Sequence, residues 1–302
     1  MAALLPQDLL TPENLRSVKG LLLLARATVN SQLPGLQRSE QLGAGQEFSQ
    51  YRSYQPGDDL RRLDWKLFAR SDRYYVREAS IESNMTVSFV LDSSASMLHE
   101  DNGITKLDYA RYLVSTLAWL AVQSGDNIGL QAINEGALVQ LPARPGRNFL
   151  QRFCYELVKI DGKGAFPRQL AQQYVPKAST KRELLIFVTD CYQSNDEINK
   201  ALTQFNQGRR EVLLFHLMGQ NELELNFKGA RTFIDLETNQ RIQVDSPSIK
   251  KQYLGQLAQH LKRIRQEALR QGISYQLFRM DEGIGDALKM FLKRRQASLT
   301  QL

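Results

Sequence analysis

The stretch Thr86-Val-Ser-Phe-Val-Leu-Asp92-Ser-Ser94-Ala-Ser96-Met97 decides the fold of this chain. Its first part, Thr86 to Leu91, is an unbroken apolar or β-branched run, which predicts a strand buried on both faces. The strand leads into Asp92-x-Ser94-x-Ser96, so one carboxylate and two hydroxyls occupy alternate positions of the following loop. Oxygen donors of this kind suit a hard divalent cation such as Mg²⁺. We therefore predict a cation site at the carboxyl end of this strand.

A second buried strand supports the same site. Leu184-Leu-Ile-Phe-Val-Thr189 is another continuous apolar run, and Asp190 follows it directly. Ligands of open α/β sheets bind beyond the carboxyl ends of the strands, so two neighbouring strands would bring Asp92 and Asp190 together. The alternative is that Asp92 and Ser94 are loop and cap residues that only satisfy backbone N–H groups. Because Asp190 matches Asp92 in placement, we favour the metal interpretation.

Strand and helix patterns alternate along the chain from residue 85 onward. Strands are predicted at 86–91, 127–133, 137–141, 184–189, 211–218 and 273–279, and helices at 105–123, 147–159, 246–271 and 284–295. Continuous apolar strands between amphipathic helices predict an α/β fold, a doubly wound and mostly parallel sheet covered on both faces. The turn signal Asn134-Glu-Gly136 predicts a hairpin within this sheet.

The predicted domain organisation has two parts. Residues 1–84 are expected to form an N-terminal extension with helical and β elements, beginning with an amphipathic helix from Pro12 to Asn30. Residues 85–302 are expected to form the α/β domain. Short alternating runs within residues 221–245 predict a small β-hairpin insertion in that domain.

Composition places the chain among ordinary globular proteins. Of its 302 residues, 42% are hydrophobic and 24% are charged. No apolar run approaches the roughly 20 residues of a membrane span, and no signal peptide pattern is visible. The two cysteines, Cys154 and Cys191, lack metal-type spacing and favour a reducing compartment, so we expect a cytoplasmic protein without a membrane span.

The net charge of +7 resides in the C-terminal helices. Residues 250–295 contain 11 Lys/Arg and 4 Asp/Glu, which accounts for the whole surplus. One interpretation is a basic surface for nucleic acid or an acidic partner. The other, which we favour, is an ordinary solvated helix face.

The two aspartate motifs resemble a known family. Asp92-x-Ser94-x-Ser96 and Val188-Thr-Asp190 are similar to the two ends of the metal-ion-dependent adhesion site of von Willebrand factor A domains. The resemblance implies a doubly wound α/β fold that binds partner proteins through Mg²⁺. That family carries a threonine between the two motifs, whereas this chain has Gly164 or Ala165 there. The exchange removes one direct or water-mediated ligand.

A preceding motif resembles a narrower family, the domain of unknown function 58 family, from about Gly35 to the C-terminus. The residues that carry this resemblance are Arg52, Tyr54, Gly57, Asp58, Asp59, Arg61, Asp64 and Trp65. The resemblance implies a bacterial or archaeal protein with a von Willebrand A-like domain that works beside a MoxR-type AAA+ ATPase. Turns, caps and ion pairs explain most of this motif, so we favour a structural role over a docking surface for the ATPase.

We therefore expect a non-enzymatic, chaperone-like adaptor that binds a MoxR-type ATPase and an unknown client protein. Asp92, Ser94, Ser96 and Asp190 are the candidate ligands of Mg²⁺. One alternative is a metal-dependent hydrolase that uses the same carboxylates, and another is nucleic-acid binding by the basic C-terminal helices. The chain has no P-loop and no Gly-x-Ser-x-Gly motif, which argues against P-loop ATP binding and an α/β-hydrolase.

Overall fold

The fold is described from a computed structural model. The described residues are 9–33, 50–53, 65–71, 73–78, 85–170, 183–193, 196–208, 210–227 and 229–299. The chain divides into two compact units, residues 1–34 with 84–302, and residues 35–83.

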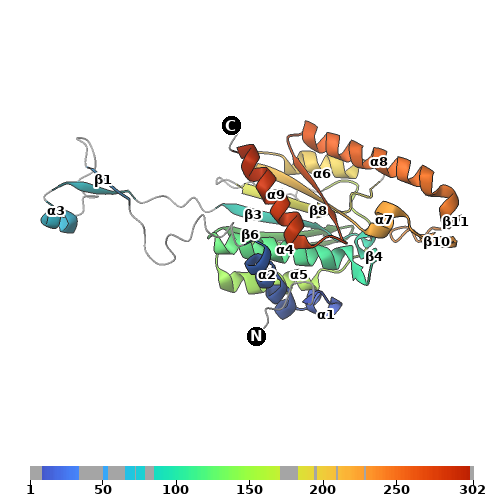
Figure 1. The fold of residues 1–302 in the computed structure, drawn as a ribbon, viewed down its shortest axis with the longest axis horizontal. Helices are drawn as coiled ribbons and strands as arrows, with labels where there is room; N and C mark the ends of the chain where they lie inside the picture. Colours follow the sequence, from blue (N-terminus) through green and yellow to red (C-terminus); the bar gives the residue numbers. More distant parts are fainter. Residues whose placement is uncertain are drawn as a thin grey trace. The chain divides into compact units, whose positions relative to one another are not determined.

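A six-stranded sheet forms the centre of the larger unit (Figure 1), with the order β12-β9-β8-β3-β6-β7. Its strands are β3 (Thr86–Asp92), β6 (Asn127–Asn134), β7 (Ala137–Arg144), β8 (Glu183–Thr189), β9 (Arg210–Met218) and β12 (Ser274–Arg279). All neighbours are parallel except β7, which returns antiparallel to β6 through the predicted hairpin. The predicted doubly wound, mostly parallel sheet is confirmed.

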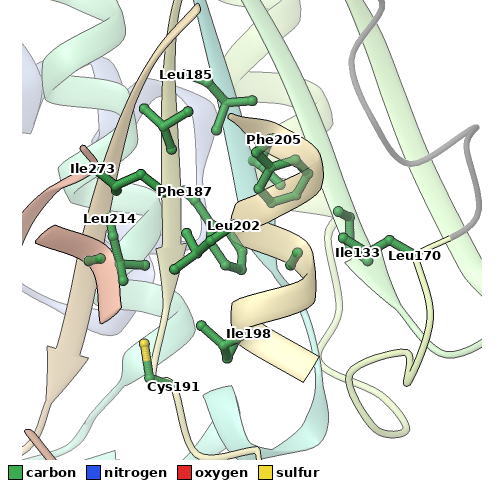
Figure 2. Packing of buried hydrophobic residues seen from close by; sticks show 14 of the residues in the cluster. Ile133, Leu170, Leu185, Phe187, Cys191, Ile198, Leu202, Phe205, Leu214 and Ile273 are labelled. Carbon is green, nitrogen blue, oxygen red and sulfur yellow. The ribbon is translucent and has the colours of Figure 1, made fainter. Parts of the chain in front are cut away.

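Helices cover both faces of this sheet. They are α4 (Lys106–Gln123), α5 (Arg147–Lys159), α6 (Glu197–Phe205), α8 (Ser246–Arg270) and α9 (Ile284–Leu299). Phe89 of β3 packs against Phe153 of α5, with ring centroids 5.6 Å apart. The next residue, Val90, belongs instead to the buried cluster that Phe205 of α6 and Ile264 of α8 complete (Figure 2). Adjacent β3 residues thus face opposite helix layers, which is why the strand is apolar without alternation.

The start of α4 follows a local capping signal, whereas that of α6 does not. Thr105 is the N-cap of α4, because its side chain accepts a hydrogen bond from the backbone N–H of Asp108 at 3.1 Å. The N-cap residue of α6 is Asp196, in a left-handed conformation and without a side-chain capping bond.

The N-terminal helix differs from expectation. The single helix predicted from Pro12 to Asn30 is wrong, since α1 (Pro12–Leu15) and α2 (Val18–Gln32) are separate. Ser17 causes the break, because its side chain accepts a hydrogen bond from the N–H of Gly20 and caps α2. The apolar side of α2 then packs against α4.

The extension expected over residues 1–84 is divided in the structure. Helices α1 and α2 share a compact unit with the sheet, because their buried side chains form part of its core. In the other unit, β1 (Gln50–Ser53) pairs antiparallel with β2 (Tyr75–Glu78), and α3 (Trp65–Ser71) lies between them in the chain.

The insertion after β9 contains the predicted hairpin and an additional helix. Residues 220–224 form α7 (Gln220–Glu224), so the expected β-structure does not begin at residue 221. The hairpin itself consists of β10 (Ala230–Ile234) and β11 (Arg241–Asp245). A short 3-10 helix, η3 (Ala95–Leu98), and the small strands β4 (Glu100–Asp101) and β5 (Ile104–Thr105) connect β3 to α4.

Candidate metal and partner-binding site

The two predicted aspartates meet at one edge of the sheet. Strands β3 and β8 are hydrogen-bonded neighbours, and Leu91 lies opposite Val188. Because the strands are parallel and in this register, Asp92 and Asp190 leave the sheet at the same edge. Both are almost completely buried, with 0% and 1% of their surface exposed. We call Asp92, Ser94, Ser96 and Asp190 the Asp92 site.

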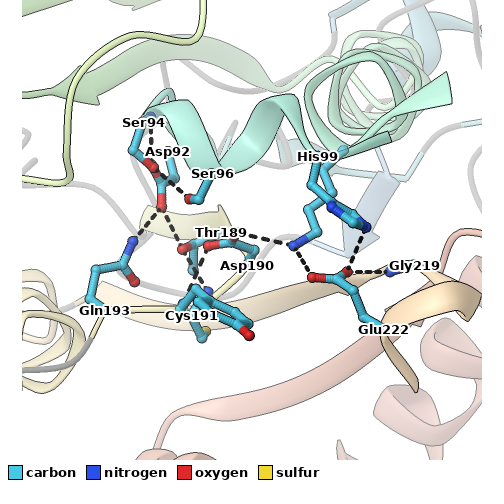
Figure 3. Close-up of polar contacts among 12 residues, drawn as sticks. Asp92, Ser94, Ser96, His99, Thr189, Asp190, Cys191, Gln193, Gly219 and Glu222 are labelled. Carbon is cyan, nitrogen blue, oxygen red and sulfur yellow. Dashed lines mark hydrogen bonds and ion pairs between the residues drawn. The ribbon is translucent and has the colours of Figure 1, made fainter. Parts of the chain in front are cut away.

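The loop after β3 folds around the Asp92 carboxylate (Figure 3). Its Oδ1 accepts hydrogen bonds from the backbone N–H of Ser94 at 2.9 Å and from the Ser94 hydroxyl at 2.7 Å. The Ser94 and Ser96 hydroxyl oxygens are 3.0 Å apart. Asp92 thus stabilises its own loop, as the alternative interpretation predicts, and also gathers both predicted hydroxyls at one point.

The second oxygen of Asp92 contacts two residues that the sequence did not single out. Oδ2 accepts hydrogen bonds from the Thr189 hydroxyl at 2.7 Å and from the Gln193 side-chain amide at 3.3 Å. Within the described residues, every hydrogen-bond donor to Asp92 is therefore a neutral group. The side-chain oxygen of Gln193, Oε1, is buried and has no hydrogen-bond partner among the residues that the structure describes.

Asp190, in contrast, has a cationic partner. The Lys106 ammonium, at the first turn of α4, lies 3.1 Å from Asp190 Oδ2 and 2.7 Å from Glu222 Oε1. Lys106 is 1% exposed, so this ion pair is shielded from water. Glu222 is fixed in turn because its Oε2 accepts a hydrogen bond from the N–H of Gly219 at 2.8 Å.

The two carboxylates consequently have opposite pKa shifts. Burial and the adjacent charge of Asp190 raise the pKa of Asp92 to about 6. Burial alone would raise the pKa of Asp190 as well, but the Lys106 ammonium outweighs it and lowers that pKa below its usual value. A negative charge on Asp92 therefore lacks the compensation that Lys106 gives Asp190.

The residues of the Asp92 site fit a hard divalent cation. They offer carboxylate and hydroxyl oxygens, and the unpartnered Gln193 Oε1 is a further buried oxygen close by. An additional positive charge would compensate Asp92. No group of three or more His, Cys, Asp and Glu side chains with metal-binding geometry occurs among the described residues, so a cation here depends on the serine hydroxyls.

The loop with Gly164 and Ala165 lies where the family resemblance predicts a threonine, and its backbone contacts the loop after β3. The Ala95 N–H donates to the carbonyl of Gly164 at 2.7 Å, and the Lys163 N–H donates to the carbonyl of Ser93 at 2.9 Å. Gly164 has a positive φ of 62°, which favours glycine. The loop therefore occupies the expected position but contributes no hydroxyl from residue 164 or 165.

Other candidate groups have structural partners. His99 Nε2 lies 2.9 Å from Asn221 Oδ1, which directs its ring to α7. His216 is buried in β9, its Nδ1 lies 3.0 Å from the Tyr275 hydroxyl, and burial lowers its pKa to about 3. Cys154 and Cys191 are both buried free thiols.

The N-terminal family motif lies largely outside the described residues. Arg52 belongs to β1 and Trp65 begins α3, but only their backbone is described. The other motif residues, which fall outside the description, are Tyr54, Gly57, Asp58, Asp59, Arg61 and Asp64. Whether this motif is structural or a docking surface stays a prediction.

The comparison with protein families identifies the chain. Residues 50–263 match the family described as "Protein of unknown function DUF58". The chain belongs to the DUF58 family. This DUF58 protein is 24% identical over 284 residues to the uncharacterized proteins Mb1516 of Mycobacterium bovis and Rv1480 of Mycobacterium tuberculosis, which covers 90% of this chain and 88% of theirs.

Similar solved structures include BatB from Bacteroides thetaiotaomicron, at 16% identity and a TM-score of 0.41, covering 70% of this chain and 100% of that one. The SpRpn10 VWA domain is 7% identical with a TM-score of 0.40, covering 68% and 95% of the two chains. Within the described part of this DUF58 protein, no helix has the length and apolar character needed to cross a membrane.

Proposed function

We propose that this DUF58 protein is a non-enzymatic adaptor that binds partner proteins through a Mg²⁺ ion at the Asp92 site. The observation that carries the proposal is the asymmetry of the two buried carboxylates. Lys106 compensates Asp190, whereas Asp92 receives hydrogen bonds from neutral groups only, within the described residues. A buried carboxylate in that position favours the binding of a cation.

Each residue of the site has a distinct part in this proposal. Asp92, Ser94 and Ser96 would hold the ion, and Asp190 would support it from the neighbouring strand. Thr189 orients the Asp92 carboxylate through its 2.7 Å hydrogen bond. When bound, Mg²⁺ would supply a positive charge with an exchangeable position, which suits an Asp or Glu side chain of a partner.

The partners follow from the family resemblance rather than from the site. We propose a MoxR-type AAA+ ATPase as one partner and a client protein as the other. The buried, unpaired thiols of Cys154 and Cys191 support a reducing, cytoplasmic setting for this role.

Calorimetric titration with Mg²⁺ and Mn²⁺ tests the site. We expect saturable binding to the wild type and its loss in Asp92→Ala, with Asp92→Asn as a second variant should the alanine variant fail to fold. Asp161→Ala is the matched control, because Asp161 is a 70% exposed carboxylate on the adjacent loop. Partner capture with and without EDTA then tests the adaptor role. Absence of metal binding by the wild type would refute the proposed site.

A further inference from the structure

A pocket of about 480 Å³ lies between α2, α4 and α5. Figure 1 shows these three helices packed together. The pocket borders the last turns of α4, whereas Lys106 at the other end of that helix contacts Asp190. Trp119, which lines the pocket, follows Lys106 by 13 residues, or roughly 20 Å along the helix axis. The pocket is therefore distinct from the Asp92 site.

Apolar side chains from all three helices form much of the pocket lining. They are Leu22 of α2, Trp119 and Val122 of α4, and Leu150 of α5. Three amide side chains also line the pocket, and none of its lining residues is acidic. Pockets of about 300–1,000 Å³ with this kind of lining bind small molecules, because apolar surface of the ligand is removed from water.

Two arginines give the pocket a positive charge. They are Arg26 of α2 and Arg147 of α5, and neither has an ion-pair or hydrogen-bond partner among the residues that the structure describes. Arg147 begins α5, whose first turn contains no acidic side chain, and this end of a helix carries a partial positive charge. The last turn of α4 carries about half a negative charge, which two guanidinium charges outweigh. The pocket therefore favours an anionic head group, which arginine binds through parallel hydrogen bonds.

Trp119 supplies a further observation. Its indole N–H is shielded from solvent and has no hydrogen-bond acceptor in the described part of the chain. A buried donor without an acceptor is unfavourable. An anionic oxygen that enters the pocket beside this ring would supply such an acceptor.

We propose that the pocket between α2, α4 and α5 is a binding site for a small amphipathic anion. The apolar body of the ligand packs against Trp119 and Leu150, and Arg26 and Arg147 bind its head group. The size of the pocket selects a small molecule, and the two unpaired arginines select a negative charge. This site is independent of the proposed adaptor function.

Titration of the full chain with phenylbutyrate and with decanoate tests this inference, by calorimetry and by NMR of the tryptophan indole N–H groups. We expect saturable binding, with a shift of the Trp119 signal, which the Trp119→Phe variant assigns. Phenylbutyramide keeps the apolar body without the charge and should bind at least about tenfold more weakly. Acetate, which has the charge without the apolar body, should show no saturable binding.

Arg26→Gln and Arg147→Gln each remove one charge from the pocket. Arg152→Gln is the matched control, because Arg152 is an exposed residue of α5 that does not line the pocket. We expect each pocket variant to weaken phenylbutyrate binding about fivefold to tenfold, and the control to bind as the wild type does.

Four results would overturn the inference. They are equal binding of phenylbutyrate and phenylbutyramide, unaltered binding by both pocket variants, a Trp119 signal that does not shift, and absence of saturable binding of both anions. Mg²⁺ binding at the Asp92 site is measured separately, so a failure of either proposal leaves the other standing.

Discussion

Replacing Lys106 by methionine is expected to destabilise the α/β unit by about 3 kcal/mol at pH 7, because it leaves buried carboxylates without their cation. The Lys106 ammonium contacts Asp190 at 3.1 Å and Glu222 at 2.7 Å. Removing one partner of a buried ion pair costs about 3–5 kcal/mol. The lower end applies here, since the Glu222 side chain is 11% exposed and can regain water, whereas that of Asp190 is 0% exposed. Methionine fills most of the lysine volume, so the cost of a cavity is small.

The pH dependence of this loss identifies its cause. In the wild type, the lowered pKa of Asp190 contributes stability that is present above the unfolded value of 3.8 and is lost as pH falls through the folded value. Without Lys106, burial makes the Asp190 charge unfavourable, so this contribution disappears. The difference in the free energy of unfolding between wild type and variant should therefore be largest at pH 7 and decrease toward pH 4 and below.

Urea denaturation in EDTA, followed by circular dichroism at both pH values, measures this difference. Lys200→Met on α6 is the control, because Lys200 is exposed and its loss should change stability by less than about 0.5 kcal/mol. A loss below about 1 kcal/mol at pH 7, or the same loss at both pH values, would refute the assignment of Lys106 as the cation that compensates Asp190.

Three further predictions concern the site and its supporting helices. In EDTA, the free energy of unfolding of the wild type should fall by about 2–3 kcal/mol as pH rises from 3.8 to about 6, since the raised pKa of Asp92 favours its protonated form in the folded state. Denaturation curves of Asp92→Asn should lack this decrease. Thr105→Ala should cost about 1 kcal/mol in urea unfolding, because the bond to the Asp108 N–H is lost, while Thr105→Ser should retain most of it. Gly20→Ala should lower stability by about 1–3 kcal/mol, because a Cβ would lie 2.3 Å from the Asn14 carbonyl oxygen, and unaltered thermal unfolding would contradict that packing.

Local patterns were sufficient for most of the fold. The apolar runs at 86–91 and 184–189 correspond to β3 and β8, and the helix predicted at 147–159 coincides with α5. These predictions succeed because the period of apolar residues reflects burial directly. The break between α1 and α2 was missed because the apolar stripe continues across it, although Ser17 offered a capping signal.

The sequence by itself placed Asp92, Ser94, Ser96 and Asp190 at the carboxyl ends of two buried strands. The tertiary structure decided that these strands, β3 and β8, are neighbours, so that the four residues meet. Only the tertiary structure decided which charges surround them. Lys106 precedes Asp190 by 84 residues and Glu222 by 116. Such contacts depend on strand order, helix packing and the path of the insertion, none of which local periodicity encodes. The candidate ligand residues could therefore be predicted from the sequence, whereas the charges that surround them arise from the fold.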